Sequence, residues 1–364
     1  MSPPRAAVGV VAAASLAAAA YAVRRLLRRR RVVQGVRAMG KVEFHAHLNG
    51  SIRLSTLVEL AEARGLAGAR ALLAGPRTLE ACFEIFALIH QCVDSLAVVR
   101  RVAREALEDF EAAGCCYVEL RSTPRALGEH TEADYVEAVV DVMATYGGAL
   151  TPRFLASVDR SRGPAAAAAT VAAVAALRRG DARARAFVVG VDFSGNPTSR
   201  HSFEAFERLF RECRDAHGLG LAIHVGECPR GDADASRILA LAREKPGRCR
   251  LGHALHVAPE DLCGAGAPLV EVCPSSNVAT LRLASLRGHP RLGDVFARGF
   301  DVPLCLCTDD TAVFGTDLAA EYLKVRDAFG LELRDLALLV ARAADRAFDA
   351  PACRAALARH GTPR

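Results

Sequence analysis

Beyond Gly40, the sequence alternates between short runs of apolar and β-branched residues and longer segments rich in Ala, Leu, Arg and Glu. This alternation is typical of parallel strands joined by crossover helices. Candidate strands lie at residues 41–45, 115–120, 153–158, 186–192, 219–224, 248–252, 269–273 and 302–307. Because eight such strands can close into a ring, the pattern predicts an α/β fold, specifically a (β/α)8 TIM barrel.

The segments between these strands are long enough to return the chain for parallel crossovers. Helices are expected at residues 96–112, 164–178, 202–216, 232–244 and 317–329. The connection from residue 49 to residue 114 exceeds a single helix, so we expect extra helices over the barrel mouth. No long linker or repeat interrupts residues 40–360, which predicts one barrel domain preceded by an extension at residues 1–39.

The net charge of +6 arises in the extension, because residues 1–42 hold eight Arg, one Lys and no acidic residue. The remainder has 38 basic residues against 41 acidic ones, so we expect no nucleic-acid partner. Twelve cysteines without a C-x-x-C pair indicate reduced thiols and a cytosolic location.

The extension itself has three interpretations. Residues 6–23 are uncharged and mostly Ala and Val, and Arg24, Arg25 and the run from Arg28 to Arg31 follow them. A membrane anchor fits the length and the positive flank, although Ala is only weakly apolar. A mitochondrial presequence fits the Arg content and the lack of acids. The third interpretation is a poorly ordered extension, and membrane contact is expected only through residues 6–31.

Polar residues able to do chemistry follow the candidate strands. They are His45, His47, Arg121 to Arg125, Asp159, Ser194, Gly195, His224, Glu227, His253, Ser275 to Asn277, Asp309 and Asp310. TIM barrels build their active sites at the carboxyl ends of the strands. We therefore expect these residues to converge in space.

Four of these residues suit a metal ion. His45 and His47 alternate on one strand, so both imidazoles face the same side. His224 after the fifth strand and Asp309 after the eighth complete a set of three nitrogens and one oxygen, which suits one zinc ion per chain with room for water. Taken separately, His224 would be interpreted as a core histidine, the two histidines of the first strand as a surface pair, and Asp309 as a helix cap. Together they predict a zinc site.

Proton transfer needs further groups near the metal. Zinc lowers the pKa of water to about 7, but an aromatic amine leaves readily only when its ring is protonated. Glu227, three residues after His224, can supply that proton. His253 can orient or deprotonate the water, and Asp310 can accept a hydrogen bond from the water or from the substrate.

These blocks carry a resemblance to a known family. The segments His45 to Ser51, Asp192 to Gly195, His224 to Glu227, Leu251 to His253 and Cys307 to Asp310 resemble the signatures of the adenosine/AMP deaminases, which are metal-dependent hydrolases. The resemblance implies zinc at His45, His47, His224 and Asp309, with Glu227 as the acid, His253 and Asp310 around the water, and the Gly195 amide on the purine. Ala254 departs from the family, in which Gly follows the barrel histidine.

Within that family, the chain resembles the adenosine deaminase-like branch, which acts on N6-methyl-AMP. The marks are Asn49, His90 and the segments Glu119 to Arg125 and Val158 to Arg160. The branch implies a purine nucleotide substrate, with N6-methyl-AMP converted to IMP and methylamine. Asn49 would not repel a 5′-phosphate as a carboxylate would, and the Ser122, Thr123, Pro124 and Arg125 loop offers hydroxyls and a guanidinium. The expected substrate contacts are His47, Asn49, His90, Ser122, Thr123, Pro124, Arg125, Asp159, Gly195, His224 and Asp310.

Other functions stay open. One is deamination of adenosine to inosine and ammonia, and another is a non-catalytic or membrane-tethered binding barrel. A binuclear amidohydrolase would need a bridging Lys after the fourth strand, whereas the lysines are Lys41, Lys245 and Lys324. A cytidine-type zinc site would need a C-x-x-C motif, which is absent. We expect a monomer.

Overall fold

The computed structural model describes residues 5–228 and 234–361, with side chains in the first helix from Tyr21 onward. Eight parallel strands form one sheet in the order β1 to β8. Their bounds are β1 Lys41–His47, β2 Cys115–Ser122, β3 Thr151–Asp159, β4 Val188–Ser194, β5 Gly220–Val225, β6 Cys249–His253, β7 Leu269–Val272 and β8 Leu304–Leu306. Each predicted strand is present, and the prediction of a TIM barrel is confirmed.

The seam between β8 and β1 closes through the backbone just beyond β8. Ala46 and Asp309 form a parallel bridge. The amide of Asp309 donates to the carbonyl of His45 at 2.8 Å, and the amide of His47 donates to the carbonyl of Asp309 at 3.0 Å. Closure therefore fixes Asp309 beside both histidines of β1.

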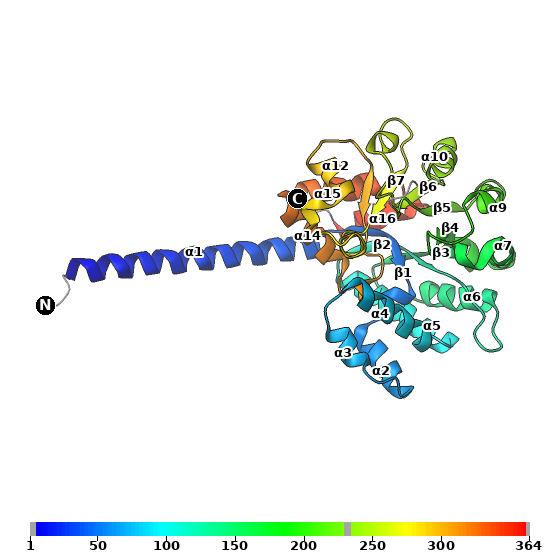
Figure 1. The fold of residues 1–364 in the computed structure, drawn as a ribbon, viewed down its shortest axis with the longest axis horizontal. Helices are drawn as coiled ribbons and strands as arrows, with labels where there is room; N and C mark the ends of the chain where they lie inside the picture. Colours follow the sequence, from blue (N-terminus) through cyan, green and yellow to red (C-terminus); the bar gives the residue numbers. More distant parts are fainter. Residues whose placement is uncertain (1–4, 229–233, 362–364) are drawn as a thin grey trace.

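Helices surround the strands (Figure 1). They are α5 Leu96–Ala112, α6 Glu132–Ala144, α7 Gly163–Gly180, α8 Ala182–Phe187, α9 Glu204–Asp215, α10 Ala235–Glu244, α11 Pro274–Thr280, α12 Pro290–Phe296, α13 Thr311–Phe314, α14 Leu318–Phe329, α15 Leu333–Ala344 and α16 Ala350–His360. The five predicted helices are among them, although residues 232 and 233 of one prediction lie outside the described residues. In α5, Ser95 caps the amino end and the buried residues recur every three or four positions, which turns one apolar face toward the barrel.

Three further helices lie between β1 and β2, as the long connection predicts. These are α2 Leu54–Ala63, α3 Ala69–Ala74 and α4 Leu79–Cys92. Helix α4 contacts α13 and the short turn η1 Asn49–Ser51, and both of these follow carboxyl ends of strands. The insertion therefore lies on the side of the barrel where an active site is expected.

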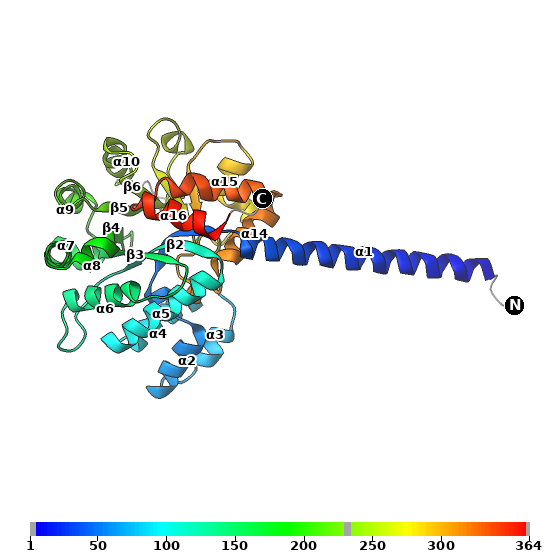
Figure 2. The same ribbon diagram turned by 180° about the vertical axis from the view of Figure 1, so that it is seen from behind.

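Helix α1, Arg5–Ala38, projects from the barrel as one long rod (Figures 1 and 2). Its last turns are attached, because Val36 is fully buried and Lys41 Nζ donates to the carbonyls of Val36 and Met39 at 2.6 Å each. Residues 21–31 are exposed. Among the residues searched, no helix is both long and apolar enough to span a membrane. The side chains of residues 6–20, on which the anchor interpretation rests, lie outside those described.

Candidate active site

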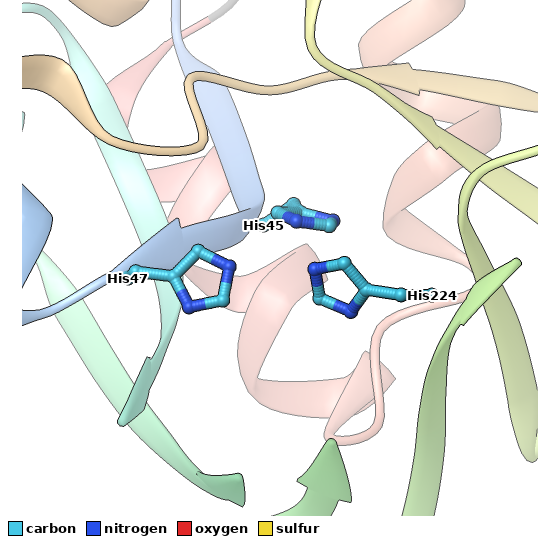
Figure 3. A group of neighbouring side chains, drawn as sticks. All are labelled: His45, His47 and His224. Carbon is cyan, nitrogen blue, oxygen red and sulfur yellow. The ribbon is translucent and has the colours of Figure 1, made fainter. Parts of the chain in front are cut away.

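Three histidines from two strands gather at the carboxyl end of the barrel. The ring centroids of His45 and His47 lie 5.3 Å apart, and that of His224 lies 4.5 Å from His45 and 5.4 Å from His47. One nitrogen from each ring lies within 4.8 Å of the others. Figure 3 shows the rings around one shared space. The alternation of His45 and His47 along β1 brings both rings to this space, as predicted.

Asp309 adds a carboxylate to this group. Its Oδ1 atom lies 3.6 Å from Nε2 of His45 and 3.4 Å from Nε2 of His47. The residue adopts a left-handed backbone with φ +63° while pairing with β1. A non-glycine residue in this region is strained, so the closed seam holds Asp309 in a conformation it would otherwise avoid.

The orientation of His45 is what a metal ligand needs. Its Nδ1 atom lies 2.8 Å from the Oε2 atom of Glu271, so Nδ1 carries the proton and donates it. Its Nε2 atom is buried and has no hydrogen-bond partner within the described part of the chain. A buried lone pair without a donor costs free energy unless a ligand satisfies it. The set of three imidazoles and one carboxylate fits zinc.

His224 is held in a similar way. Its Nδ1 atom lies 3.0 Å from the carbonyl of Phe193 and 3.1 Å from Oδ1 of Asp192. Asp192 also accepts a hydrogen bond from Arg121 at 2.9 Å, and the same guanidinium donates to Glu271 at 2.7 Å. One fully buried arginine therefore positions both carboxylates, and these in turn orient the two histidines.

The surroundings set the protonation of the rings. Burial lowers the pKa of His47 to about 4 and holds that of His45 well below its usual range, with the Arg121 charge adding to the effect on His45. Burial also acts against the charged form of His224, but the Asp192 carboxylate outweighs it and raises the pKa to about 9. His45 and His47 are therefore neutral near pH 7, as metal ligands must be, whereas His224 would have to release a proton when an ion binds.

The predicted proton-transfer residues lie around the same space. The Nε2 atom of His253, at the end of β6, lies 3.9 Å from Oε1 of Glu227 and 3.9 Å from Oδ2 of Asp309. The Glu227 side chain is 28% exposed, so a substrate can reach it. Burial and the Asp309 charge raise the pKa of Asp310 well above its usual range.

Asp310 is fitted closely to the turn after β1. A Cβ atom at Gly50 would lie 1.7 Å from Oδ1 of Asp310. Gly50 therefore has no room for a side chain. Its close contact with Asp310 brings the loops after β1 and β8 together.

The predicted phosphate side is assembled in part. The Ser122 hydroxyl lies 2.7 Å from the Tyr135 hydroxyl, which donates to Oδ1 of Asn49 at 3.3 Å. Arg125 donates to the carbonyl of Val93. Beside them, Pro124 is buried and Thr123 is half-buried.

His90 lies near this group, in the last turn of α4. Partial burial lowers its pKa, and the charge of Arg125 adds to the effect while that of Asp159 opposes it. Asn49 and Ser122 are thus linked through Tyr135, and His90 shares the neighbourhood of Arg125.

Asp159 and Gly195 lie side by side at the ends of β3 and β4. Gly195 has φ +95°, and a Cβ atom there would come within 2.1 Å of Oδ1 of Asp159. Asp159 accepts hydrogen bonds from the amide and hydroxyl of Ser161 at 2.9 and 2.7 Å. The absence of a side chain at Gly195 therefore makes room for the Asp159 carboxylate.

The backbone conformation at Ala254 explains why Gly is preferred after the barrel histidine. His253 has φ +60° and Ala254 has φ +48°, so two consecutive residues adopt the left-handed region. A glycine would adopt this conformation without strain, which accounts for a preference for Gly after the barrel histidine. Here Ala254 adopts this conformation with a side chain present.

Several residues of the site were missed by sequence analysis. Glu271 is a charged residue inside an apolar strand, and that position is the signal that could have revealed it. Cys273 is buried with its thiol near His45 and Asp309, and its place one residue after β7 is a comparable signal. Tyr135 lies on α6, where nothing in the sequence distinguishes it from a core aromatic residue.

Comparisons with known proteins agree with this geometry. The family model for adenosine deaminase matches residues 40–360. The chain is 35% identical over 315 residues to the N6-methyl-AMP deaminase of Danio rerio, covering 81% of this chain and 86% of that protein. It is similar to the crystal structure of arabidopsis ADAL complexed with IMP, with TM-score 0.76, 30% identity, and coverage of 89% and 97% of the two chains. It is also similar to a Burkholderia ambifaria amidohydrolase with bound Zn, with TM-score 0.74, 25% identity, and coverage of 90% and 92%.

Proposed function

From the membership of this chain in the adenosine deaminase family, which makes it a hydrolytic deaminase, we propose that it acts on C6 of an adenine 5′-monophosphate with the help of zinc. The preferred reaction is N6-methyl-AMP to IMP and methylamine. The observation that carries the proposal is the Nε2 atom of His45, which has no hydrogen-bond partner among the described residues and faces two other imidazoles beside an accessible glutamate. Adenosine deamination is the second candidate, because the chain matches the family model for adenosine deaminase.

Zinc would be held by His45, His47, His224 and Asp309, one ion per chain. Support comes from the lone pair at His45 Nε2, from the three-nitrogen, one-oxygen donor set, and from the similar amidohydrolase with bound Zn. When bound, zinc supplies a Lewis acid that lowers the pKa of water near neutrality.

Residues of the chain would transfer the protons and hold the purine and the water. Glu227 would hold a proton for the purine ring nitrogen, because protonation makes the ring accept a nucleophile at C6. Asp310 would accept a hydrogen bond from the water or from a purine nitrogen, and the Gly195 amide would hold the purine edge. His253 would orient the water. His47 and His224 would also border the substrate.

The nucleotide preference rests on the other side of the site. We assign the 5′-phosphate to Ser122, Thr123, Pro124 and Arg125, with Asn49 replacing a repulsive carboxylate and His90 adding a donor. Asp159 would support the purine side beside Gly195. The similar structure with bound IMP shows that a relative accommodates a nucleoside monophosphate.

One experiment tests the function directly. The zinc-loaded protein is offered N6-methyl-AMP, AMP, N6-methyladenosine and adenosine in parallel, and products are separated by chromatography. We expect kcat/KM to be highest for N6-methyl-AMP, with IMP as the product. A preference for adenosine would favour the second candidate, and absence of turnover on all four would contradict both.

We further propose that residues 40–360 are the catalytic domain and that residues 1–39 affect location only, with the cytosol as the expected compartment. Mitochondrial or membrane attachment through the extension is the alternative. Since Val36 is buried and bonded to Lys41, truncation after residue 31 tests this better than removal of the whole helix. The truncated protein should keep full activity, and imaging of tagged full-length protein should assign the compartment. Gel filtration should give a monomer.

A further inference from the structure

A chain of hydrogen bonds runs from the backbone of α12 to His253. The amide of Leu292 donates to Nδ1 of His289 at 3.3 Å. Nε2 of His289 lies 3.1 Å from Oδ1 of Asn277, and Nδ2 of Asn277 lies 3.0 Å from Nδ1 of His253. Asn277 and His289 are each 1% exposed, so water does not compete for these contacts.

Only one arrangement of protons satisfies this chain. A backbone amide always donates, so Nδ1 of His289 must be an acceptor, and the ring proton of His289 lies on Nε2. That proton can be donated only to the carbonyl oxygen of Asn277, which turns its NH2 group toward His253. Nδ1 of His253 must then accept, which leaves the proton of this ring on Nε2.

Burial favours the same arrangement. It lowers the pKa of His289 to about 3, with the Arg291 charge adding to the effect, so this ring is neutral near pH 7. The ring of His289 therefore carries a single proton, as the chain of hydrogen bonds requires.

We propose that Asn277 and His289 are positioning residues that hold the proton of His253 on Nε2, so that His253 acts as a hydrogen-bond donor to the attacking oxygen and not as a base. This inference rests on the proposed function. A base at this position would need a free lone pair on Nε2, which the chain of hydrogen bonds denies. The water proton must then go to a carboxylate, and Glu227, 3.9 Å from Nε2 of His253, can accept it once its own proton has passed to the ring nitrogen.

The position of the proton can be read directly. The zinc-loaded protein is labelled with 15N-histidine, and nitrogen–proton correlation spectra distinguish protonated from unprotonated ring nitrogens. The His253 signals are assigned by their loss in His253→Gln. We expect Nε2 protonated and Nδ1 unprotonated in both His253 and His289. A proton on Nδ1 of His253 in the wild type overturns the proposal, whatever substrate the protein uses.

Asn277→Asp provides a variant of nearly unchanged shape. A carboxylate can only accept, so it forces a proton onto Nδ1 of His253 and frees Nε2 in the neutral ring. We expect kcat to fall about 10²–10³-fold, as for the loss of one well-placed donor, with little change in KM. Wild-type kcat with the proton shown on Nδ1 alone would overturn the proposal. Thr280→Val, on the same helix, is the control and should keep wild-type kcat.

Position 289 separates positioning from packing. The side chain of Gln in His289→Gln can still donate to Oδ1 of Asn277, whereas His289→Leu fills space without a donor. We expect the Gln variant to keep the Nε2 proton on His253 and kcat within about threefold of wild type, and the Leu variant to lose tenfold or more. Equal losses in two folded variants would show that packing alone matters and would overturn the role of His289. Inactivity of the wild type would contradict the proposed function but leave the tautomer result intact.

Discussion

The Nδ1 atom of His45 lies 2.8 Å from Oε2 of Glu271, which leaves only the Nε2 side of the ring to face the other histidines. Glu271 is itself fully buried and paired with Arg121 and Arg250 at 2.7 Å each. The direction of a proposed metal ligand is therefore determined by an ion-pair network inside the barrel. Carboxylates that orient ligating histidines in this way strengthen metal binding.

Glu271→Gln should weaken zinc binding about 10–100-fold, because the amide is a poorer acceptor for the His45 proton. Competition with a chromophoric chelator measures the affinity. Glu119→Gln is a matched control, since Glu119 is an equally buried partner of Arg250, and its contacts do not include His45. Both variants should lose stability, but only Glu271→Gln should lose zinc affinity. Equal zinc affinities would contradict the proposed orientation.

Glu227→Gln should abolish turnover while zinc content and IMP binding change little. The amide keeps the shape of the side chain but cannot transfer a proton, and general acid–base catalysis contributes about 10²–10⁴-fold. Steady-state rates, metal analysis and IMP titration test these three expectations together. Activity within threefold of wild type would show that another group supplies the proton.

Arg125→Ala should cost about 1.5–3 kcal/mol of transition-state binding for a 5′-monophosphate, the range for hydrogen bonds to charged groups, and almost nothing for the nucleoside. Asn49→Asp should penalise the monophosphate through charge repulsion. The measurement is kcat/KM for AMP, N6-methyl-AMP and their nucleosides at constant salt, because salt screens phosphate contacts. Equal slowing of nucleotide and nucleoside by Arg125→Ala would mean that the phosphate site is misassigned.

Ala254→Gly should leave the protein as stable as the wild type or more stable by up to about 1 kcal/mol. Relief of the left-handed strain, roughly 1–2 kcal/mol, exceeds the added entropy of the unfolded chain. Ala258→Gly is the control in the same loop, because Ala258 has φ −62° and should lose about 0.5–1 kcal/mol. Urea unfolding gives both values. Similar destabilisation in both variants would argue against strain at Ala254.

His289 should make the protein sensitive to acid. Its pKa is about 3 in the folded state and near 6.5 unfolded, so between these values only the unfolded chain binds the proton. Stability then falls as the pH drops below about 6.5, by up to about 1.4 kcal/mol per pH unit. His289→Gln removes this contribution. The stability of the variant relative to the wild type should therefore rise as the pH is lowered from 6.5 to 4.5. Parallel stability profiles for the two metal-free proteins would contradict the assignment.

The sequence was sufficient to predict the rim of the barrel because parallel strands end at one edge. His45, His224 and Asp309 could be placed together from this rule alone, although they are far apart in the chain. The same rule says nothing about which side chains lie beneath the rim. Glu271 contacts His45 because β7 and β1 lie on either side of β8 in the closed ring, and one sequence does not contain that register.

The residues behind His253 were harder still to predict. Asn277 was predicted only as one of several polar residues after the seventh strand, and His289 was not singled out. Their connection depends on how the residue before α12 packs against α11, which local periodicity does not predict. The branch that the sequence resembles is also that of the similar N6-methyl-AMP deaminases.

The seam at Asp309 couples opening of the barrel to loss of the proposed zinc site. The ring of strands closes through the amide and carbonyl of Asp309, and the proposed zinc oxygen belongs to the same residue. Opening of β8 from β1 would separate the carboxylate from the histidines and remove the last bridge of the ring in a single event. Hydrogen exchange at the Asp309 amide would therefore report release of the ion, and occupancy of the site would slow exchange there before it slowed exchange in the helices.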